Sequence, residues 1–181
     1  MKAIKRITAL ALCALMLLGL LSGCGEKKQR DEKFVLNVSV CNVIDSLDPA
    51  MNTDADADSV FYALYENLMR ESDDGSGEVT LTNGMAKEYT EETNYDGSVT
   101  YRFTLRSTAR WSDGEKVTAD DFVYAWQRLA DPATDSPNHA LMSVVAGYDD
   151  VRETGDKTKL QVSAKDESTF VVTLSAPCAY F

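Results

Sequence analysis

One local pattern, centred on an Asp-Gly pair, constrains the fold of this chain most strongly. Two segments, residues 85–93 and 98–105, flank Asn94-Tyr95-Asp96-Gly97. The Asp-Gly pair supplies the positive φ angles that a tight reversal needs, so the two segments are predicted to form an antiparallel hairpin. Every second residue of the later segment is apolar, which is typical of a strand with one buried face. The hairpin therefore turns an apolar face toward a core.

Upstream of this hairpin the sequence predicts a strand and a helix joined by a loop. Residues 34–40 alternate well enough for a strand with one strongly apolar face. Residues 46–50 are expected to form a loop, because a proline within them has no N–H to give to a ladder. Apolar side chains recur at helical spacing over residues 57–70, and acids at 54–58 lie where a helix dipole favours them. Residues 71–77 have no apolar content and are expected to form a turn.

Downstream of the hairpin the sequence predicts a turn, a capped helix and a last strand. Residues 111–114 form the turn, and Thr118 is placed as the N-cap of a helix with two aspartates in its first turn. Asp131-Pro132 ends this helix, and a further helical turn or two fits residues 137–145. Residues 169–174 form the last strand.

Composition and charge exclude several classes of protein. The chain has 181 residues, of which 44% are hydrophobic and 26% charged, as in a globular protein of one ordinary or two small domains. With 18 basic and 29 acidic residues, its formal net charge is −11. Nucleic-acid binding needs a basic face that releases counterions, so no nucleic-acid partner is expected. The same balance disfavours docking by charge onto an anionic membrane.

The N-terminal segment has the organisation of an export signal. Three basic residues lie within the first six, and residues 7–21 are apolar or small apart from one threonine. The run is shorter than the about 20 residues of a spanning helix. Its end, Leu21-Ser22-Gly23-Cys24, resembles the lipobox of bacterial lipoproteins, which are cleaved before the cysteine and lipidated on its sulfur. An ordinary signal with a chance cysteine is the alternative, and residues 24–33 are expected to form a polar tether.

Two cysteines remain once Cys13 is removed with the signal and Cys24 carries the lipid. An exported location allows Cys41 and Cys178 to pair, but sequence alone cannot match two thiols so far apart. We favour two free thiols. Cys41 ends an apolar strand pattern, where a buried free cysteine behaves as a small hydrophobe. The disulfide remains the alternative.

Residues able to carry catalysis or to bind a metal are scarce. His139 is the single histidine of the chain, and no Gly-x-Ser-x-Gly motif accompanies it, so a hydrolase is disfavoured. Asp54, Asp56 and Asp58 alternate like the start of a calcium loop, but the glycine and glutamate that complete such a loop are missing. No metal, cofactor or enzymatic activity is expected. Trp111 beside its turn is open to a core or a ligand-stacking role.

Several motifs in one order carry a family resemblance. The run from Tyr101-Arg102-Phe103-Thr104-Leu105-Arg106 through Trp111-Ser112-Asp113-Gly114 to the motif of residues 117–126 resembles family 5 of the extracytoplasmic solute-binding proteins. These are the oligopeptide- and dipeptide-binding lipoproteins of ABC importers. Ser46-Leu47-Asp48-Pro49-Ala50 resembles their early Leu-Asp-Pro loop. The resemblance covers nearly all of residues 34–181 and only the N-terminal third of such a protein.

The resemblance implies a fold and a division into domains. The fold is a mixed α/β, periplasmic-binding-protein type II-like structure of two lobes that close over the ligand. Residues 34–66 begin the first lobe. Residues 67–181 form most of a small extra domain that is truncated at its C-terminal end, and the second lobe is missing from this fragment.

The resemblance also implies a ligand site. The segment after Leu-Asp-Pro runs beside the bound peptide in the oligopeptide binders, which corresponds here to Thr53, Asp54 and Ala55. The residue after Ser-Pro, typically tyrosine, is a ligand contact; here it is Asn138, followed by His139. The segment suits strand addition, in which backbone groups hold a peptide without reading its side chains.

The function implied is that of a lipid-anchored binding protein on the outer side of the cell membrane. It captures oligopeptides as a monomer and delivers them to an ABC permease and its ATPase subunits. A sensory or adhesive surface lipoprotein with the same fold is the alternative. A non-peptide solute, such as a nickel complex or a sugar, is the other open possibility.

Overall fold

The computed structural model describes residues 35–39, 41, 43–73 and 75–181. The chain divides into a first unit of residues 1–39 and a second of residues 40–181. In the first unit, residues 35–39 have no regular secondary structure, and three of their apolar side chains are 70–71% exposed. The predicted strand is therefore wrong over these residues, because no described residue offers them a hydrogen-bonding neighbour. The predicted signal, Cys24 and the tether lie outside the described residues.

The second unit is built on a four-stranded antiparallel sheet of order β3-β4-β6-β5. Its strands are β3 (Ala86–Thr93), β4 (Val99–Leu105), β5 (Val162–Asp166) and β6 (Thr169–Leu174). The hairpin predicted from the Asp-Gly pair is confirmed, with Gly97 at φ +86°. The last predicted strand is confirmed as β6, which pairs with β4 from Val99 opposite Leu174 to Thr104 opposite Thr169.

The helix predicted over residues 57–70 is shorter and begins earlier. It is α2 (Ala55–Leu64), and it is followed by a two-stranded sheet of β1 (Met69–Asp73) and β2 (Val79–Asn83). The carbonyls of Asn67 and Leu68 accept hydrogen bonds from the backbone before and at the start of β3, at 2.7–3.1 Å. This pairing fixes residues 67–68 in an extended course and ends the helix. Part of the turn predicted at residues 71–77 is therefore strand.

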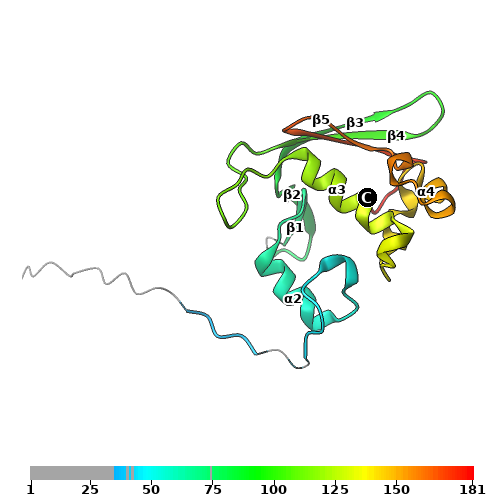
Figure 1. Ribbon diagram of the computed structural model, residues 1–181. Helices are drawn as coiled ribbons and strands as arrows, with labels where there is room; N and C mark the ends of the chain where they lie inside the picture. Colours follow the sequence, from blue (N-terminus) through cyan, green and yellow to red (C-terminus); the bar gives the residue numbers. More distant parts are fainter. Residues whose placement is uncertain (1–34, 40, 42, 74) are drawn as a thin grey trace, which may run out of the picture. The chain divides into compact units, whose positions relative to one another are not determined.

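The capped helix after the hairpin is confirmed as α3 (Ala119–Ala130), which lies along one face of the main sheet (Figure 1). The backbone N–H of Thr118 donates to the Asp121 carboxylate at 2.7 Å. Short 3₁₀ segments and one further helix complete the unit. They are η2 (Pro49–Met51), η3 (Pro132–Thr134), η4 (His139–Val144), α4 (Tyr148–Thr154) and η5 (Lys157–Lys159).

The core between α3 and the sheet centres on Phe170 of β6, which is fully buried. Its ring lies 5.1 Å from that of Trp126, 5.7 Å from that of Phe122 and 6.4 Å from that of Phe103, measured between ring centroids. Trp126 is thus a packing residue, as its place in the apolar stripe of the helix indicates. The helix and the sheet share one apolar interior.

Cys41 and Cys178 are free thiols, as favoured from the sequence. Cys41 is exposed, however, so its expected role as a buried hydrophobe is wrong. The strand that was expected to bury it does not form among the described residues. None of the helices in the described ranges combines the length and the apolar character of a membrane-spanning segment.

Candidate functional site

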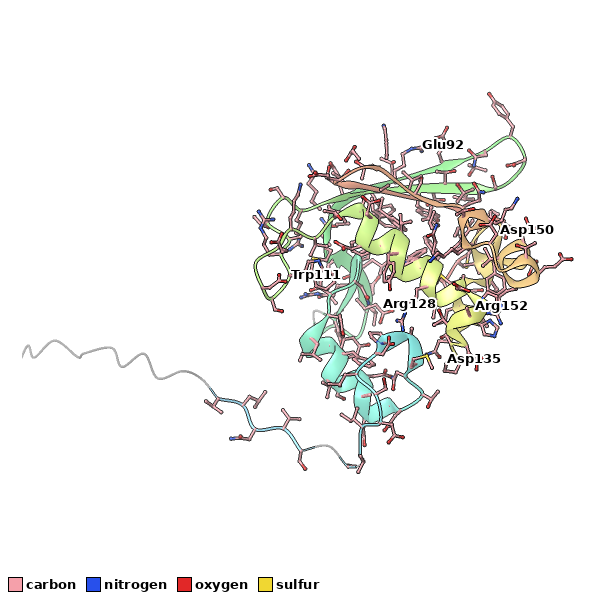
Figure 2. The ribbon with its side chains drawn as sticks, in the orientation of Figure 1. Glu92, Trp111, Arg128, Asp135, Asp150 and Arg152 are labelled. Atoms are coloured by element: carbon pink, nitrogen blue, oxygen red, sulfur yellow. The ribbon has the colours of Figure 1, made fainter. Side chains whose placement is uncertain are left out.

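The two segments assigned to the ligand site lie against each other. Side chains on and after α3 reach the loop of residues 48–52 at every second residue, and Figure 2 shows Arg128 projecting toward that loop. We call these three contacts the latch. They join Arg128 to the Asp48 carboxylate, the Ser136 hydroxyl to the Ala50 carbonyl, and the Asn138 amide to the Asn52 carbonyl.

Ser136 is the buried centre of the latch, with 2% of its surface exposed. Its hydroxyl donates to the Ala50 carbonyl and accepts the backbone N–H of Asn138 at 3.0 Å. A buried hydroxyl is costly unless it is hydrogen-bonded, and both of its roles are used here. The serine therefore ties the loop to the start of η4.

The ion pair of the latch is bidentate. Arg128 Nη1 and Nη2 donate to Asp48 Oδ1 and Oδ2 at 2.9 and 2.5 Å. The guanidinium hydrogen bonds lower the pKa of Asp48, against a smaller opposing effect of burial, and the same bonds raise the pKa of Arg128. Both side chains keep about a third of their surface exposed (35% and 33%), so solvent screens the pair in part.

The Asp48–Arg128 ion pair makes the stability of the protein depend on pH. Replacing Asp48 by asparagine is expected to remove this dependence while keeping the hydrogen bond from the Ala50 N–H at 3.1 Å. Because the folded pKa lies below the unfolded one, the ion pair stabilises the protein above the unfolded pKa of about 3.9. The stabilisation is lost as the pH falls through the lower, folded pKa. Urea unfolding should show a loss of about 1 kcal/mol at neutral pH and none in strong acid.

Asp45→Asn is the matched control, since Asp45 is exposed and forms no ion pair within the described residues. An equal loss at neutral and strongly acidic pH for Asp48→Asn would show that the residue acts through packing rather than charge. A loss as large for Asp45→Asn would show a general charge effect.

Thr53, Asp54 and Ala55 lie where the latched loop enters α2. Asp54 is the N-cap of the helix, as the acidic cluster predicted, and its carboxylate accepts the Asp56 N–H at 2.9 Å. Thr53 lies between two residues of extended backbone, and its side chain is exposed. No hydrogen bond found among the described residues uses the Thr53 backbone. Within the described residues, the Thr53 N–H and carbonyl therefore have no hydrogen-bond partner.

Asn138 and His139 are both engaged within the protein. The Asn138 amide donates to the Asn52 carbonyl at 2.6 Å, one residue before Thr53. His139 Nδ1 lies 2.6 Å from the hydroxyl of the buried Tyr148, with the two rings stacked. The structure thus brings Asn138 beside the predicted peptide-contacting segment, and it gives His139 a partner in the interior.

The sequence reasoning missed the arginine and the serine of the latch. Arg128 and Asp48 are separated by 80 residues, and Ser136 and Ala50 by 86. Nothing local in the sequence connects them. The Leu-Asp-Pro and Ser-Pro motifs that contain Asp48 and Ser136 were the available signal.

Trp111 lies outside this site. It is 45% exposed and lines a pocket of about 400 Å³ with Leu64, Tyr65 and residues of α3. Its indole N–H is 3.4 Å from the Asp121 carboxylate. Within the described residues, no group of three acidic, cysteine or histidine side chains is placed to hold a metal ion.

The family model of the bacterial extracellular solute-binding proteins, family 5 Middle, matches residues 80–181. The dipeptide-binding protein of Lactococcus lactis subsp. cremoris is 32% identical over 181 residues, covering 99% of this chain and 30% of that protein. The periplasmic oligopeptide-binding protein OppA of Salmonella typhimurium is 41% identical over 142 residues, covering 76% of this chain and 24% of that protein. The chain thus spans less than a third of these relatives.

Solved structures agree with the sequence matches. Haemophilus influenzae OppA in complex with the peptide RPPGFSPFR superposes with a TM-score of 0.64 at 37% identity, covering 75% of this chain and 26% of that one. Listeria monocytogenes OppA bound to peptide gives 0.67 at 30% identity, covering 76% and 26%. The expected mixed α/β fold of the periplasmic-binding-protein type is confirmed. The relatives are binding proteins rather than enzymes, and this chain belongs to family 5 of the bacterial extracellular solute-binding proteins.

Proposed function

We propose that the chain is part of a lipid-anchored oligopeptide-binding protein that delivers peptides to an ABC permease outside the cytoplasm. The named relatives bind dipeptides and oligopeptides, and two of the solved ones hold peptide. Residues 34–66 would begin the first lobe and residues 67–181 most of the small extra domain. The ligand would be closed in by the parts of the fold that the relatives have beyond this span, and the protein would act as a monomer.

The observation that carries this proposal is the position of Thr53. The latch holds the residues before it, and the N-cap of α2 fixes the residue after it. Thr53, the residue between them, is exposed, and its backbone N–H and carbonyl have no partners among the described residues. A peptide added alongside would pair with these groups whatever its side chains. Such binding suits a carrier of peptides of many sequences.

We propose that Asn138 has a positioning role beside the ligand contact that the resemblance implies. Its amide nitrogen is used on the Asn52 carbonyl. We infer that Asn138 positions the peptide-contacting segment, together with Ser136, and that His139 holds η4 against α4 through Tyr148. Asp54 acts through the helix cap, and Ala55 begins the helix beside the peptide.

The test of the proposal is peptide uptake by cells. Deleting the gene from an amino-acid auxotroph should abolish growth on an oligopeptide that contains the required amino acid, while growth on the free amino acid continues. Normal growth on peptides of several lengths would favour the sensory or adhesive lipoprotein. Failure to bind peptides, with binding of a nickel complex or a sugar, would favour the non-peptide solute.

Lipidation of Cys24 is expected to fix the protein to the membrane. Cys24→Ala has no sulfur to carry the acyl chains, so the lipid anchor is absent. When cells are fractionated, the variant should be absent from the membrane fraction. Cys41→Ala is the matched control and should stay with the membranes. Equal partitioning of the Cys24→Ala protein and the unmodified one would contradict the anchor.

A further inference from the structure

A second pocket, of about 300 Å³, lies at the end of the main sheet where β4 ends and β6 begins. We call it the basic pocket, because three cations and no carboxylate line it, in a chain of formal net charge −11. Its lining residues are Lys87, Thr104, Leu105, Arg106, Ser107, Lys116, Val117 and Ser168. The local sign of charge is therefore opposite to that of the chain as a whole.

The three cations come from separate parts of the sequence. Lys87 lies in β3 where the register with β4 shifts between Ala86 and Glu88. Arg106 directly follows β4. Lys116 lies after the turn at Trp111, where its backbone forms an isolated antiparallel β-bridge with that of Arg110. Irregularities of this kind redirect side chains at the rim of a sheet. The fold, rather than a local run of basic residues, gathers them.

Several hydrogen-bond donors in the basic pocket have no acceptor among the described residues. The Arg106 guanidinium donates from Nη2 to the Asn83 carbonyl at 2.6 Å, and its other N–H groups meet no acceptor among the described residues. None of the hydrogen bonds found there uses the Thr104 hydroxyl, or the hydroxyl and backbone N–H of Ser107. Donors that converge on one cavity favour a ligand with several acceptor oxygens.

Two carboxylates at the rim balance part of this charge. Glu167 lies 2.8 Å from Lys116 Nζ, and Glu88 lies 3.3 Å from Lys87 Nζ. Their side chains are 76% and 64% exposed, and Lys116 lowers the pKa of Glu167. Exposed pairs of this kind contribute little to stability. A ligand anion can therefore replace them on the lysines.

We propose that the basic pocket binds a phosphate-bearing anion. A phosphate group carries a charge of about −1.5 to −2 at neutral pH and three strong acceptor oxygens, which matches three cations and the free hydroxyl and N–H donors. A carboxylate brings half the charge and one oxygen fewer. The proposal does not depend on the peptide-binding function, because the basic pocket shares no residue with the latch or with Thr53.

The phosphate group has two sources, a soluble phosphate compound or the headgroup of an anionic lipid. The strongly acidic chain as a whole is repelled by an anionic membrane. This repulsion opposes the lipid source, and two separate experiments, a soluble arm and a lipid arm, distinguish the two sources. The soluble arm uses inorganic phosphate and pyrophosphate, and the lipid arm uses vesicles of phosphatidylglycerol or phosphatidylcholine.

The soluble arm is a calorimetric titration of the full-length protein with each phosphate. Lys116→Gln should weaken binding about tenfold, the effect of losing one charged hydrogen bond. Glu167→Gln should strengthen binding, because it removes the competing carboxylate. Lys157→Gln is the matched control. Lys157 is exposed and lies in η5, just before the start of β5, whereas the basic pocket lies near the end of β5. Lys116→Arg should bind phosphate as the unmodified protein does, because it keeps the positive charge at this position.

The lipid arm follows flotation of the Cys24→Ala protein with each kind of vesicle, so that the anchor does not contribute. Flotation with phosphatidylglycerol alone, lost in Lys116→Gln and kept in Lys157→Gln, assigns the pocket to a lipid headgroup. Binding in the soluble arm alone assigns it to a soluble compound. Absence of binding in both arms overturns the proposal, as does binding that Lys116→Gln and Lys157→Gln weaken equally. Thermal melting of each variant confirms folding.

Discussion

Phe170→Ala is expected to lower the free energy of unfolding by about 3–5 kcal/mol, the cost of truncating a fully buried aromatic side chain. Phe170 is fully buried, and its ring meets those of Phe103, Phe122 and Trp126. These neighbours come from β4 and α3, so the cavity would open between the helix and the sheet. Backbone hydrogen bonds of β6 on both sides limit how far the site can collapse.

Urea unfolding followed by tryptophan fluorescence measures this loss. Trp126→Ala gives a graded comparison, because Trp126 is only partly buried and should cost less than Phe170. Tyr124→Ala is the control on the same helix, since Tyr124 is 64% exposed and its loss should change stability little. A loss below about 1 kcal/mol for Phe170→Ala would mean that the core lies elsewhere.

Gly147→Ala is expected to destabilise the protein by more than about 3 kcal/mol, through strain and overlap together. Gly147 precedes α4 at φ +82°, a conformation that side chains with a Cβ rarely adopt. A Cβ at this position would lie 2.1 Å from the Lys159 carbonyl oxygen, which is backbone and cannot rotate away. Either α4 or the segment before β5 must move.

Gly155→Ala separates the two effects. Gly155 also has a positive φ, +73°, but a Cβ there would meet nothing within 4 Å. Its replacement should cost only the about 1–2 kcal/mol of a left-handed alanine. Thermal unfolding of both variants gives the difference directly. Equal melting temperatures would show that the close approach of Gly147 to Lys159 does not persist in solution.

The parts of the fold that the sequence predicted are those fixed by local chemistry. The Asp-Gly pair sets the β3–β4 turn, and Thr118 with Asp121 sets the start of α3. The strands β1, β2 and β5 were not predicted. β1 is mostly polar, and the β5 sequence Val-Ser-Ala-Lys-Asp has only a weak alternation. β2 does alternate, but only from Val79 to Thr82, and all of its residues are exposed.

Tertiary pairing overrode local periodicity at the end of α2. Leu68 and Met69 continue the helical spacing, yet the Leu68 carbonyl accepts hydrogen bonds from Gly84 and Ala86. The carbonyl cannot serve those partners and a continuing helix at once. A single sequence contains no sign of this choice. Helix α4 was missed because its seven residues, Tyr148–Thr154, are too few to establish a periodic stripe.

The structure brings together the two segments of the candidate site. Motif resemblance placed Thr53 and Asn138 in one site, and the structure joins their segments through the Asn138–Asn52 hydrogen bond. The Asn138 side chain donates to the carbonyl of a residue 86 positions earlier in the sequence, so this contact depends on the tertiary fold. The resemblance to a direct ligand contact gave no indication that the amide is turned toward the protein's own backbone.

The measurement that tests the central claim most directly is peptide affinity when only the Thr53 backbone N–H is removed. Thr53→Pro removes this donor, whereas Thr53→Ala keeps it and removes the exposed side chain; Asn52 already has the extended backbone that precedes proline readily. In calorimetry of the full-length protein against mixed di- to pentapeptides, Thr53→Ala should bind as the unmodified protein does. Thr53→Pro, with unchanged melting, should lose about 5- to 50-fold in affinity for peptides of every sequence. Equal affinity of the two variants would contradict strand addition at Thr53.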